Sequence, residues 1–378
     1  MRVDLYLKHF PPQGSPLRVG TCKAVHGLAS GLKDCGVQVT VLCEGPKPSV
    51  CHSPAGYDIV CYRNDRPYRS FRLSEDLERH VRMRAEQDAL IVANGIFNPS
   101  VYGVGRAARR AGVPYVMAPH GAYDLPLFQR NPHLKWPYWY LYERPTLQAA
   151  SAVQVLDERH REWTEHRGVQ TPVVEVPNGY SPGDVRPRTA LRWRRSGRVR
   201  LLYWGRMHVQ QKGLDLLLEA FARLTSTIPM DLTLQGPDWH GEKRWILREI
   251  ARLELDHHVH VLDPDFVHPP TELMADYDVV CMPSRYEGFG LSALEAMLAG
   301  RPVLVTELSG VAPHVVRAGG GVVVQPDVQS IVDGLVTLLE NRADWQQMGL
   351  GAFHYVVENL SWKAIAQNAM FHYRQLVQ

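Results

Sequence analysis

The most informative part of the chain reads Pro283-Ser284-Arg285-Tyr286-Glu287-Gly288-Phe289-Gly290-Leu291-Ser292-Ala293-Leu294-Glu295-Ala296-Met297. An apolar run at 279–282 precedes this segment. Within the segment, a Gly-x-Gly turn comes before a stretch with helical periodicity. We therefore expect a buried strand, a turn with Glu287, and a helix that carries Glu295 in its second turn. Backbone N–H groups at a helix N-terminus bind phosphate, and carboxylates accept hydrogen bonds from sugar hydroxyls. A nucleotide sugar is the predicted ligand, and an ordinary strand-turn-helix with two solvated acids is the alternative.

Length and composition predict a folded protein of two domains. The chain has 378 residues, of which 45% are hydrophobic and 21% are charged. At roughly 150 residues per domain, two domains are the natural reading. The formal net charge of +3 is too small to indicate a nucleic-acid partner.

Short apolar runs alternate with helical patterns in both halves of the chain. In the first half we expect strands at 3–7, 37–43, 59–62, 89–93 and 115–118, and helices at 18–35 and 99–111. In the second half we expect strands at 199–203, 232–234, 259–262, 279–282, 303–305 and 322–324, and helices at 214–224, 243–253 and 293–298. Such alternation is typical of doubly wound α/β domains with a parallel sheet.

A segment rich in Arg and Pro at 181–188 can neither continue a helix nor pair as a central strand, so we place the domain boundary there. The first domain is predicted at 1–183, the second at 184–360, and a final helical element at 361–378. Ligands of doubly wound sheets bind at the carboxyl ends of the strands. The residues that follow the predicted strands are therefore the candidates for a site.

Two cations follow the first strand of the second domain. Gly205-Arg206 ends that strand, and Lys212-Gly213 precedes the amphipathic helix. A guanidinium and an ammonium group held beside a helix N-terminus form a cradle for a diphosphate, and they stabilise the charge that grows on a leaving nucleoside diphosphate. Two surface cations on a loop are the alternative.

The segment from Glu287 to Glu295 resembles the E-x7-E signature of family 4 of the retaining glycosyltransferases. Glu287 is followed by Gly-Phe-Gly and Glu295 by Ala-Met, as in that family, and the resemblance covers nearly the whole chain. It implies the GT-B fold, in which two Rossmann-like domains face a cleft and the last helix crosses back to the first domain. It also implies transfer of a hexose from a nucleoside diphosphate sugar with retention at the anomeric carbon.

The resemblance also implies roles for individual residues. Glu295 matches the position that binds the ribose hydroxyls, and Glu287 matches the position nearest the hexose. The spacing before Lys212 is one residue longer than the commonest form of the family's Gly-Arg…Lys-Gly motif, and Gly14-Ser15 stands where Gly-Gly is common. The complete set of expected donor-binding residues is Gly14, Gly205, Arg206, Lys212, Glu287, Gly288, Phe289, Gly290, Leu291 and Glu295.

In the first domain, His120 follows the strand at 115–118. By itself, a histidine there is more often structural than catalytic. In the resembling family a histidine at this position reaches the donor sugar, so we assign His120 to catalysis in a positioning and electrostatic role, beside Arg206, Lys212 and Glu287. Asp124 is a candidate contact for the acceptor hydroxyl.

No metal ion and no cofactor are expected. Asp263 and Asp265 imitate a metal-binding D-x-D motif, but they follow a strand of the doubly wound second half. His258 and His260 would point to the same face of a strand and their neighbours to the other, so the histidine cluster at 257–260 is interpreted as structural or solvated.

Other features bear on partners and location. Seven arginines crowd the segment 63–84, and an aromatic-rich segment lies at 133–142. They predict an acceptor that is a saccharide or is lipid-linked, and peripheral association with the inner face of a membrane; a solvated face and helix packing are the alternatives. Six cysteines without paired spacing, no apolar run of 18 residues and no signal segment predict a cytoplasmic protein.

The donor is predicted to be UDP-glucose or another UDP-hexose, for synthesis of a polysaccharide or glycoconjugate. A GDP-mannose-dependent mannosyltransferase is the first alternative. A sugar-nucleotide epimerase with the GT-B fold is the second.

Overall fold

The computed structural model describes residues 1–11, 19–64, 70–121, 123, 125–129 and 131–377. It divides into two compact units, the first made of Met1–Gly179 and Trp362–Gln378 and the second of Tyr180–Ser361. The division comes before residue 183 because Tyr180 is tied to the second unit. Its N–H donates to the carbonyl of Leu360 and its hydroxyl to that of Val357, both at 3.0 Å.

The first unit contains an eight-stranded sheet in the order β3-β4-β2-β1-β5-β6-β7-β8. Its strands are β1 (Arg2–Tyr6), β2 (Gln38–Gly45), β3 (Ser49–His52), β4 (Asp58–Arg63), β5 (Ala89–Asn94), β6 (Tyr115–Ala118), β7 (Ala152–Val155) and β8 (Val173–Glu175). All five strands expected from apolar runs are present. Three short strands, β3, β7 and β8, were not anticipated, and β3 departs from the parallel pattern because it pairs with β4 as an antiparallel edge.

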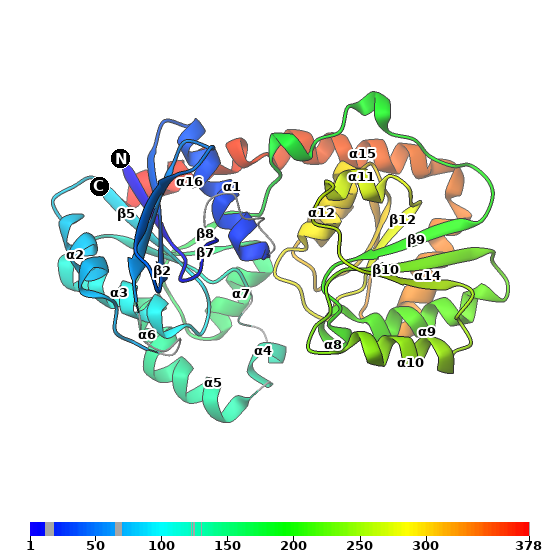
Figure 1. Cartoon of the computed structure of the whole chain (residues 1–378), viewed down its shortest axis with the longest axis horizontal. Helices are drawn as coiled ribbons and strands as arrows, with labels where there is room; N and C mark the ends of the chain where they lie inside the picture. Colours follow the sequence, from blue (N-terminus) through cyan, green and yellow to red (C-terminus); the bar gives the residue numbers. More distant parts are fainter. Residues whose placement is uncertain (12–18, 65–69, 122, 124, 130, 378) are drawn as a thin grey trace. The chain divides into compact units, whose positions relative to one another are not determined.

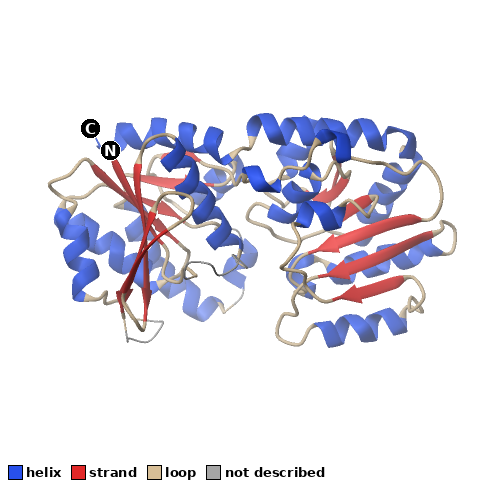
Figure 2. Ribbon diagram, turned by 45° about the horizontal axis from the view of Figure 1, so that its top comes forward, coloured by secondary structure: helices blue, strands red, loops and turns tan. Residues whose placement is uncertain are grey.

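Helices cover both faces of this sheet (Figure 2). The helices of the first unit are α1 (Gly20–Asp34), α2 (Glu75–Met83), α3 (Pro99–Ala111), α4 (Leu125–Gln129), α5 (Pro132–Tyr138), the π-helix η1 (Trp139–Glu143), α6 (Arg144–Gln148), α7 (Glu158–His166) and α16 (Trp362–Val377). Side chains of each strand alternate between the faces. Val3 and Leu5 pack with α1 and α16, whereas Tyr6 packs with α2 and α3.

The last helix returns to the first unit and packs along α1. Small residues on α1 permit this approach: a Cβ on Gly27 would overlap the indole of Trp362, and a Cβ on Gly31 would overlap the Trp362 carbonyl group. The hydroxyl of Tyr373 donates to the side chain of Gln154 at the other end of the helix. Steric fit at two glycines therefore fixes where α16 lies.

The second unit contains a parallel six-stranded sheet in the order β11-β10-β9-β12-β13-β14. Its strands are β9 (Val199–Trp204), β10 (Met230–Gln235), β11 (Val259–Leu262), β12 (Val279–Met282), β13 (Val303–Thr306) and β14 (Gly321–Val324). All six match the expected runs. The order reverses at β9, whose neighbours are β10 and β12. Loops on the two sides of β9 therefore diverge at the carboxyl edge, which is where doubly wound sheets bind ligands.

Two groups of helices enclose the second sheet (Figure 1). One group consists of α9 (Leu214–Thr225), α10 (Lys243–Arg252) and α14 (Val328–Glu340), and the other of α11 (Pro270–Met274), α12 (Leu291–Leu298), α13 (Ala312–Ala318) and α15 (Trp345–Asn359). Short elements complete the unit: α8 (Val209–Lys212), η2 (Pro182–Asp184), η3 (Arg188–Ala190) and η4 (Arg342–Asp344).

The aromatic-rich segment at 133–142 forms α5 and most of η1. Trp139 is buried, and Tyr142 packs against Phe71 with ring centres 4.5 Å apart. Tyr140 and Leu141 are exposed. Leu134 is exposed as well. Helix packing therefore accounts for part of this segment, and three large apolar or aromatic side chains remain at the surface.

The docking of α16 can be tested by removing its buried anchor. Trp362 is 7% exposed and Phe371, on the same helix, is 61% exposed. Trp362→Ala should lower the free energy of unfolding of the first unit by about 3–5 kcal/mol, because it leaves a cavity against α1. Phe371→Ala should change it by less than about 0.5 kcal/mol. Urea unfolding followed by circular dichroism measures both, and equal effects would contradict this account of the helix.

Candidate functional site

The loops after β9 and β10 lie against each other at the carboxyl edge of the second sheet. The N–H of Gly205 donates to the carbonyl of Gln235 at 3.0 Å, and the N–H of Met207 to that of Pro237 at 2.9 Å. Gly236 has φ 153°, and a Cβ there would overlap the carbonyl of Gly205. Backbone contact between these loops therefore requires glycine at 236.

Arg206 projects from this loop and is exposed. Its guanidinium carbon lies 4.4 Å from the centre of the Trp239 ring, a cation–π contact that limits where the group can point. His208 stacks on the same indole with centres 5.7 Å apart and planes inclined by 16°. Sequence reasoning missed Trp239, although an aromatic residue just after β10, next to the switch point, was a usable signal.

Lys212 and Glu287 form an ion pair, so two predicted site residues that are 75 positions apart meet directly. Their side chains are only 10% and 18% exposed. Gly213, which follows Lys212, has φ 64°, and a Cβ there would overlap the carbonyl of Pro283. Close approach of the loops after α8 and β12 at this glycine is what brings the ammonium group to the carboxylate.

A second pairing holds the same two loops. Arg285 donates from both terminal nitrogens to Asp215 in α9, at 2.7 and 2.6 Å, and its N–H donates to the carbonyl of Gln211 at 2.9 Å. Such a bidentate pair fixes orientation as well as distance. Neither Arg285 nor Asp215 was among the predicted site residues, because their role depends on a contact between distant segments.

The Gly-x-Gly turn is held by the loop after β13. The N–H of Glu287 donates to the carbonyl of Leu308 at 3.3 Å, and the Phe289 carbonyl accepts from the Val311 N–H at 2.7 Å and from the Ser309 hydroxyl at 3.1 Å. The side chain of Phe289 is buried, so it belongs to the core of the turn.

Gly290 adopts φ 103° and starts α12 at Leu291. The first turn of this helix has no acidic residue, so its positive end is not neutralised by the helix itself. Glu295 lies in the second turn and is half-buried. The expected strand, turn and helix are all present, with Glu287 and Glu295 where the pattern placed them.

In the first unit, His120 follows β6 and adopts φ 57°, an uncommon conformation for a residue with a side chain. Its Nε2 lies 2.6 Å from Oδ1 of Asn94, whose amide nitrogen donates to the carbonyls of Tyr6 and Val92. Oδ1 must therefore accept, so Nε2 carries the proton. Burial lowers the pKa of His120 to about 4, and its neutral ring leaves Nδ1 as a hydrogen-bond acceptor.

A buried carboxyl group lies beside this loop. Glu143 Oε1 accepts from the hydroxyl of Tyr123 at 2.7 Å and from the N–H of Phe97 at 3.1 Å. Burial raises the pKa of Glu143 to about 7, although both hydrogen bonds oppose the rise. Phe97 has φ 48°, and backbone strain of this kind costs ~1–3 kcal/mol and persists only where neighbouring contacts enforce it. No sequence pattern singled out Glu143.

Some predicted features lie elsewhere. Gly14 and Asp124 fall outside the described residues. Asp263 pairs with Lys243 at 2.8 Å, and Asp265 pairs with His268 at 2.8 Å. Among the residues that the structure describes, no group of three or more His, Cys, Asp or Glu side chains is arranged to hold a metal ion.

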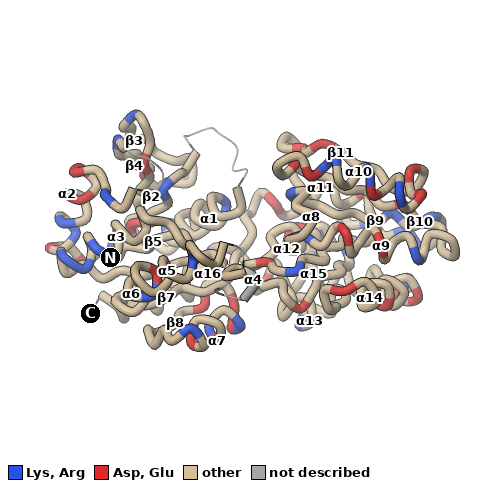
Figure 3. The backbone as a smooth tube through the Cα atoms, turned by 90° about the horizontal axis from the view of Figure 1, so that it is seen from below, with Lys and Arg blue, Asp and Glu red and all other residues tan. Residues whose placement is uncertain are grey.

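The arginine-rich segment is not one uniform basic patch. Arg84 is buried, and its Nε donates to Asp4 at 2.6 Å in the core of the first unit. Arg79 pairs with Asp76, and acidic side chains begin α2 while basic ones follow towards its end (Figure 3). Arg66 and Arg69 lie outside the described residues. Within the described part of the chain, no helix is both long enough and apolar enough to cross a membrane.

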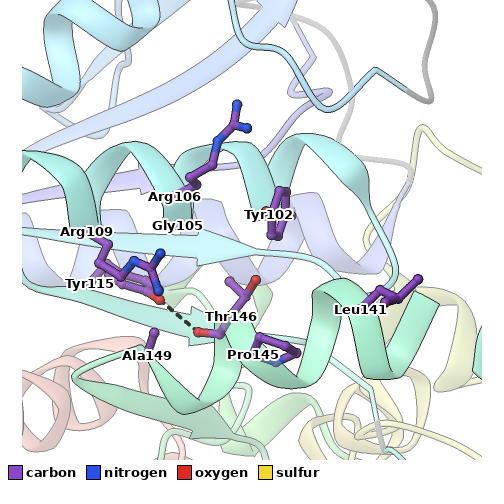
Figure 4. A pocket seen from close by; sticks show the side chains of 9 residues that line it. All are labelled: Tyr102, Gly105, Arg106, Arg109, Tyr115, Leu141, Pro145, Thr146 and Ala149. Atoms are coloured by element: carbon purple, nitrogen blue, oxygen red, sulfur yellow. Dashed lines mark hydrogen bonds between the residues drawn. The ribbon is translucent and has the colours of Figure 1, made fainter. Parts of the chain in front are cut away.

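A separate pocket of about 100 Å³ lies in the first unit between α3 and the η1–α6 segment (Figure 4). The hydroxyl of Tyr115 donates to the carbonyl of Thr146 at 2.8 Å inside it. It is lined by Tyr102, Gly105, Arg106, Arg109, Tyr115, Leu141, Pro145, Thr146 and Ala149. None of the predicted site residues lines this pocket.

The depressed pKa of His120 predicts a pH-dependent contribution to stability. The unfolded histidine takes up a proton near pH 6.5, whereas the folded one does so only near pH 4. The contribution of neutral His120 to the free energy of unfolding is thus fully present above pH 6.5, and it is lost as the pH falls towards 4. The difference in unfolding free energy between wild type and His120→Gln, measured by urea unfolding, should shrink over this window. A difference that stays constant would contradict the assignment.

Two family profiles match the chain. Residues 19–179 match "Glycosyl transferase 4-like domain", and residues 198–341 match "Glycosyl transferases group 1". Among curated proteins, an MMP α-(1→4)-mannosyltransferase of Mycolicibacterium hassiacum is 31% identical over 48% of this chain and 45% of its own length. A D-inositol 3-phosphate glycosyltransferase of Corynebacterium diphtheriae is 35% identical over 44% of this chain and 40% of its own. The chain thus matches less than half the length of these two relatives.

Solved structures are similar over nearly the whole chain. Sucrose-phosphate synthase from Thermosynechococcus elongatus has a TM-score of 0.75 at 21% identity and covers 99% of this chain and 98% of its own. Anabaena HepE in complex with UDP and glucose has a TM-score of 0.72 at 19% identity and covers 98% and 99%. The predicted GT-B fold is confirmed. With one profile on each domain, the chain belongs to the group 1 glycosyltransferases with a glycosyl transferase 4-like first domain.

Proposed function

We propose that the protein is a retaining, metal-independent glycosyltransferase that moves a hexose from a UDP-sugar to a saccharide or lipid-linked acceptor. The observation that carries the proposal is the Lys212–Glu287 ion pair beside the N-terminus of α12, at the carboxyl edge of a doubly wound sheet. That site combines fixed positive charge for a diphosphate with a carboxylate for sugar hydroxyls. The donor would bind in the second unit and the acceptor in the first.

Each group has a separate task in this proposal. Arg206, Lys212 and the start of α12 stabilise negative charge on the departing diphosphate. Lys212 already has a carboxylate partner, so a bound diphosphate would compete with Glu287 for the ammonium group and leave Glu287 available to the hexose. Glu295 would bind the ribose. His120, neutral at physiological pH, would accept a hydrogen bond from a sugar hydroxyl at Nδ1.

UDP is favoured as the nucleotide because HepE, which shares the fold, was solved with UDP and glucose. A GDP-mannose-dependent mannosyltransferase is the second candidate, because one relative at 31% identity is named a mannosyltransferase. Incubation with UDP-glucose, UDP-galactose and GDP-mannose, with and without EDTA, separates the candidates by the nucleotide released. The proposal expects UDP release that EDTA does not reduce. Loss of release with EDTA and rescue by Mn²⁺ would contradict metal independence.

The cradle can be tested with a pair of arginine variants. Arg206→Ala should raise the activation free energy by ~2–4 kcal/mol and so lower turnover, because it removes a charge whose contact strengthens as the diphosphate leaves. The control is Arg248→Ala, which removes an exposed arginine of α10 in the same unit. Steady-state release of UDP measures both. Near-native turnover of a folded Arg206→Ala protein would exclude this residue from the cradle.

The two glutamates should differ in effect. Glu295→Gln should weaken UDP binding, because it removes the charge offered to the ribose hydroxyls. Glu287→Gln should reduce turnover with little change in UDP affinity, because its contact with the hexose strengthens as positive charge develops on the ring. Calorimetry with UDP and kinetics with UDP-glucose measure the two effects.

The Glu287 variant also releases Lys212 from its partner. The double variant Glu287→Gln with Lys212→Met removes both charges of the pair and controls for an unpaired buried ammonium group. If Glu287→Gln abolishes UDP binding while Glu295→Gln leaves it intact, the proposed roles are reversed.

A further inference from the structure

We propose that Glu143 is a positioning residue for the first-unit site: its carboxyl group ties together the loops that follow β5 and β6 and so holds His120 in place. This inference rests on the proposed function, because it assumes that His120 acts on the donor sugar. It concerns a residue outside all the motifs that point to the family.

The two loops are joined at two levels. At the ends of the strands, Nε2 of His120 meets Oδ1 of Asn94 at 2.6 Å, and the N–H of Gly95 donates to the carbonyl of Ala118 at 2.9 Å. Farther out, a single oxygen of Glu143 accepts from Phe97 in one loop and from Tyr123 in the other. Phe97 is three residues beyond Asn94, and Tyr123 is three residues beyond His120. Glu143 therefore joins the two loops a second time, three residues farther along the chain than the contact between Asn94 and His120.

Both loops contain backbone that needs such a constraint. His120 and Phe97 have φ 57° and φ 48°, a region that residues with a large side chain seldom occupy. These conformations persist only where the surroundings enforce them. For Phe97 one such contact is the hydrogen bond from its own N–H to Glu143, which holds the peptide unit where the strain lies. Without that acceptor, the half-buried N–H of Phe97 and the buried hydroxyl of Tyr123 would both lose the hydrogen bond they make here.

An irregular helix delivers Glu143 to this position. It is the last residue of the π-helix η1, and single-turn π-helices frequently mark functional sites. The wider turn changes which side chains face the sheet, and Glu143 is turned inward where it is 3% exposed. An isolated carboxyl group is costly to bury. Its two donors, one from each loop, offset that cost and give the residue a specific place.

Titratable and charged groups around Glu143 come from each neighbouring segment. Tyr123 donates to it, and the hydroxyl of Tyr138 in α5 is buried nearby, where burial and Glu143 raise the pKa of Tyr138. Arg167 donates to the carbonyl of Tyr123 at 3.3 Å, and Lys135 lies over the ring of Phe97. Since the pKa of Glu143 is raised to about 7, the group changes charge near neutral pH. The charged form accepts the two hydrogen bonds more strongly.

Two substitutions of Glu143 distinguish a positioning role from a role in folding alone. Glu143→Leu removes the shared acceptor, whereas Glu143→Gln keeps one acceptor oxygen, cannot ionise, and replaces the second oxygen by an NH2 group. The matched control is Glu165→Gln, at an exposed position of α7. Release of UDP from UDP-glucose measures activity, calorimetry with UDP measures the second unit alone, and nitrogen NMR of the His120 imidazole measures its position without any substrate.

We expect Glu143→Leu to lower UDP release about tenfold, the equivalent of one hydrogen bond to a charged group, and to shift the His120 ring signals. UDP affinity should not change. Wild-type activity should rise around pH 7 as Glu143 ionises. Glu143→Gln should keep activity to within about twofold of wild type at pH 6 and should not show this rise. If the Leu protein does not fold, Tyr123→Phe, which removes one of the two donors, should shift the same His120 signals.

The inference is overturned if the His120 signals of Glu143→Leu, or of Tyr123→Phe, match those of wild type, or if the Gln and Leu variants lose activity equally. Failure of the proposed function gives a different result. In that case wild type neither binds UDP nor releases it from UDP-glucose, while the NMR comparison still reports whether Glu143 holds His120.

Discussion

The arrangement of the candidate site depends on one topological constraint, the reversal of strand order in a parallel sheet. All carboxyl ends of parallel strands meet at the same edge, and the loops diverge where the order reverses. In the second unit this happens at β9, between β10 and β12. Arg206, Lys212 and Glu287 come from loops on the two sides of that point. In the first unit the order reverses at β1, and the next strands along the sheet, β5 and β6, carry Asn94 and His120 at their ends.

Glycine determines how closely these loops approach each other. At Gly213 and Gly236 a side chain would overlap a carbonyl group of the neighbouring loop, and both residues have positive φ. Backbone contact at these two points leaves the polar side chains facing the same region. The Lys212–Glu287 and Arg285–Asp215 pairs then compensate charges that would be costly to leave unpaired when partly buried. The charged side chains of the proposed donor site are thus held in place by their own partners.

The two units hold their polar groups in different ways. In the second unit, charged side chains pair with one another near the surface of the sheet edge. In the first unit, a neutral histidine and a buried carboxyl group are held by hydrogen bonds, and burial moves the pKa of His120 to about 4 and that of Glu143 to about 7. Burial disfavours the charged form in both cases, so one pKa falls and the other rises. In the proposed function, charge is concentrated in the second unit, where the diphosphate would leave.

Local sequence patterns sufficed for most of the fold and for the donor motifs. Apolar runs located eleven of the strands, because a strand buried on both faces has a continuous apolar signature, and the spacing of Glu287 and Glu295 placed both around one turn and helix. Tertiary structure alone brought Lys212 to Glu287, Trp239 to Arg206 and Glu143 to Phe97 and Tyr123, and it removed Arg84 from the surface by pairing it with Asp4. These contacts join segments distant in the chain, so no periodicity records them; they arise only when packing brings the segments together.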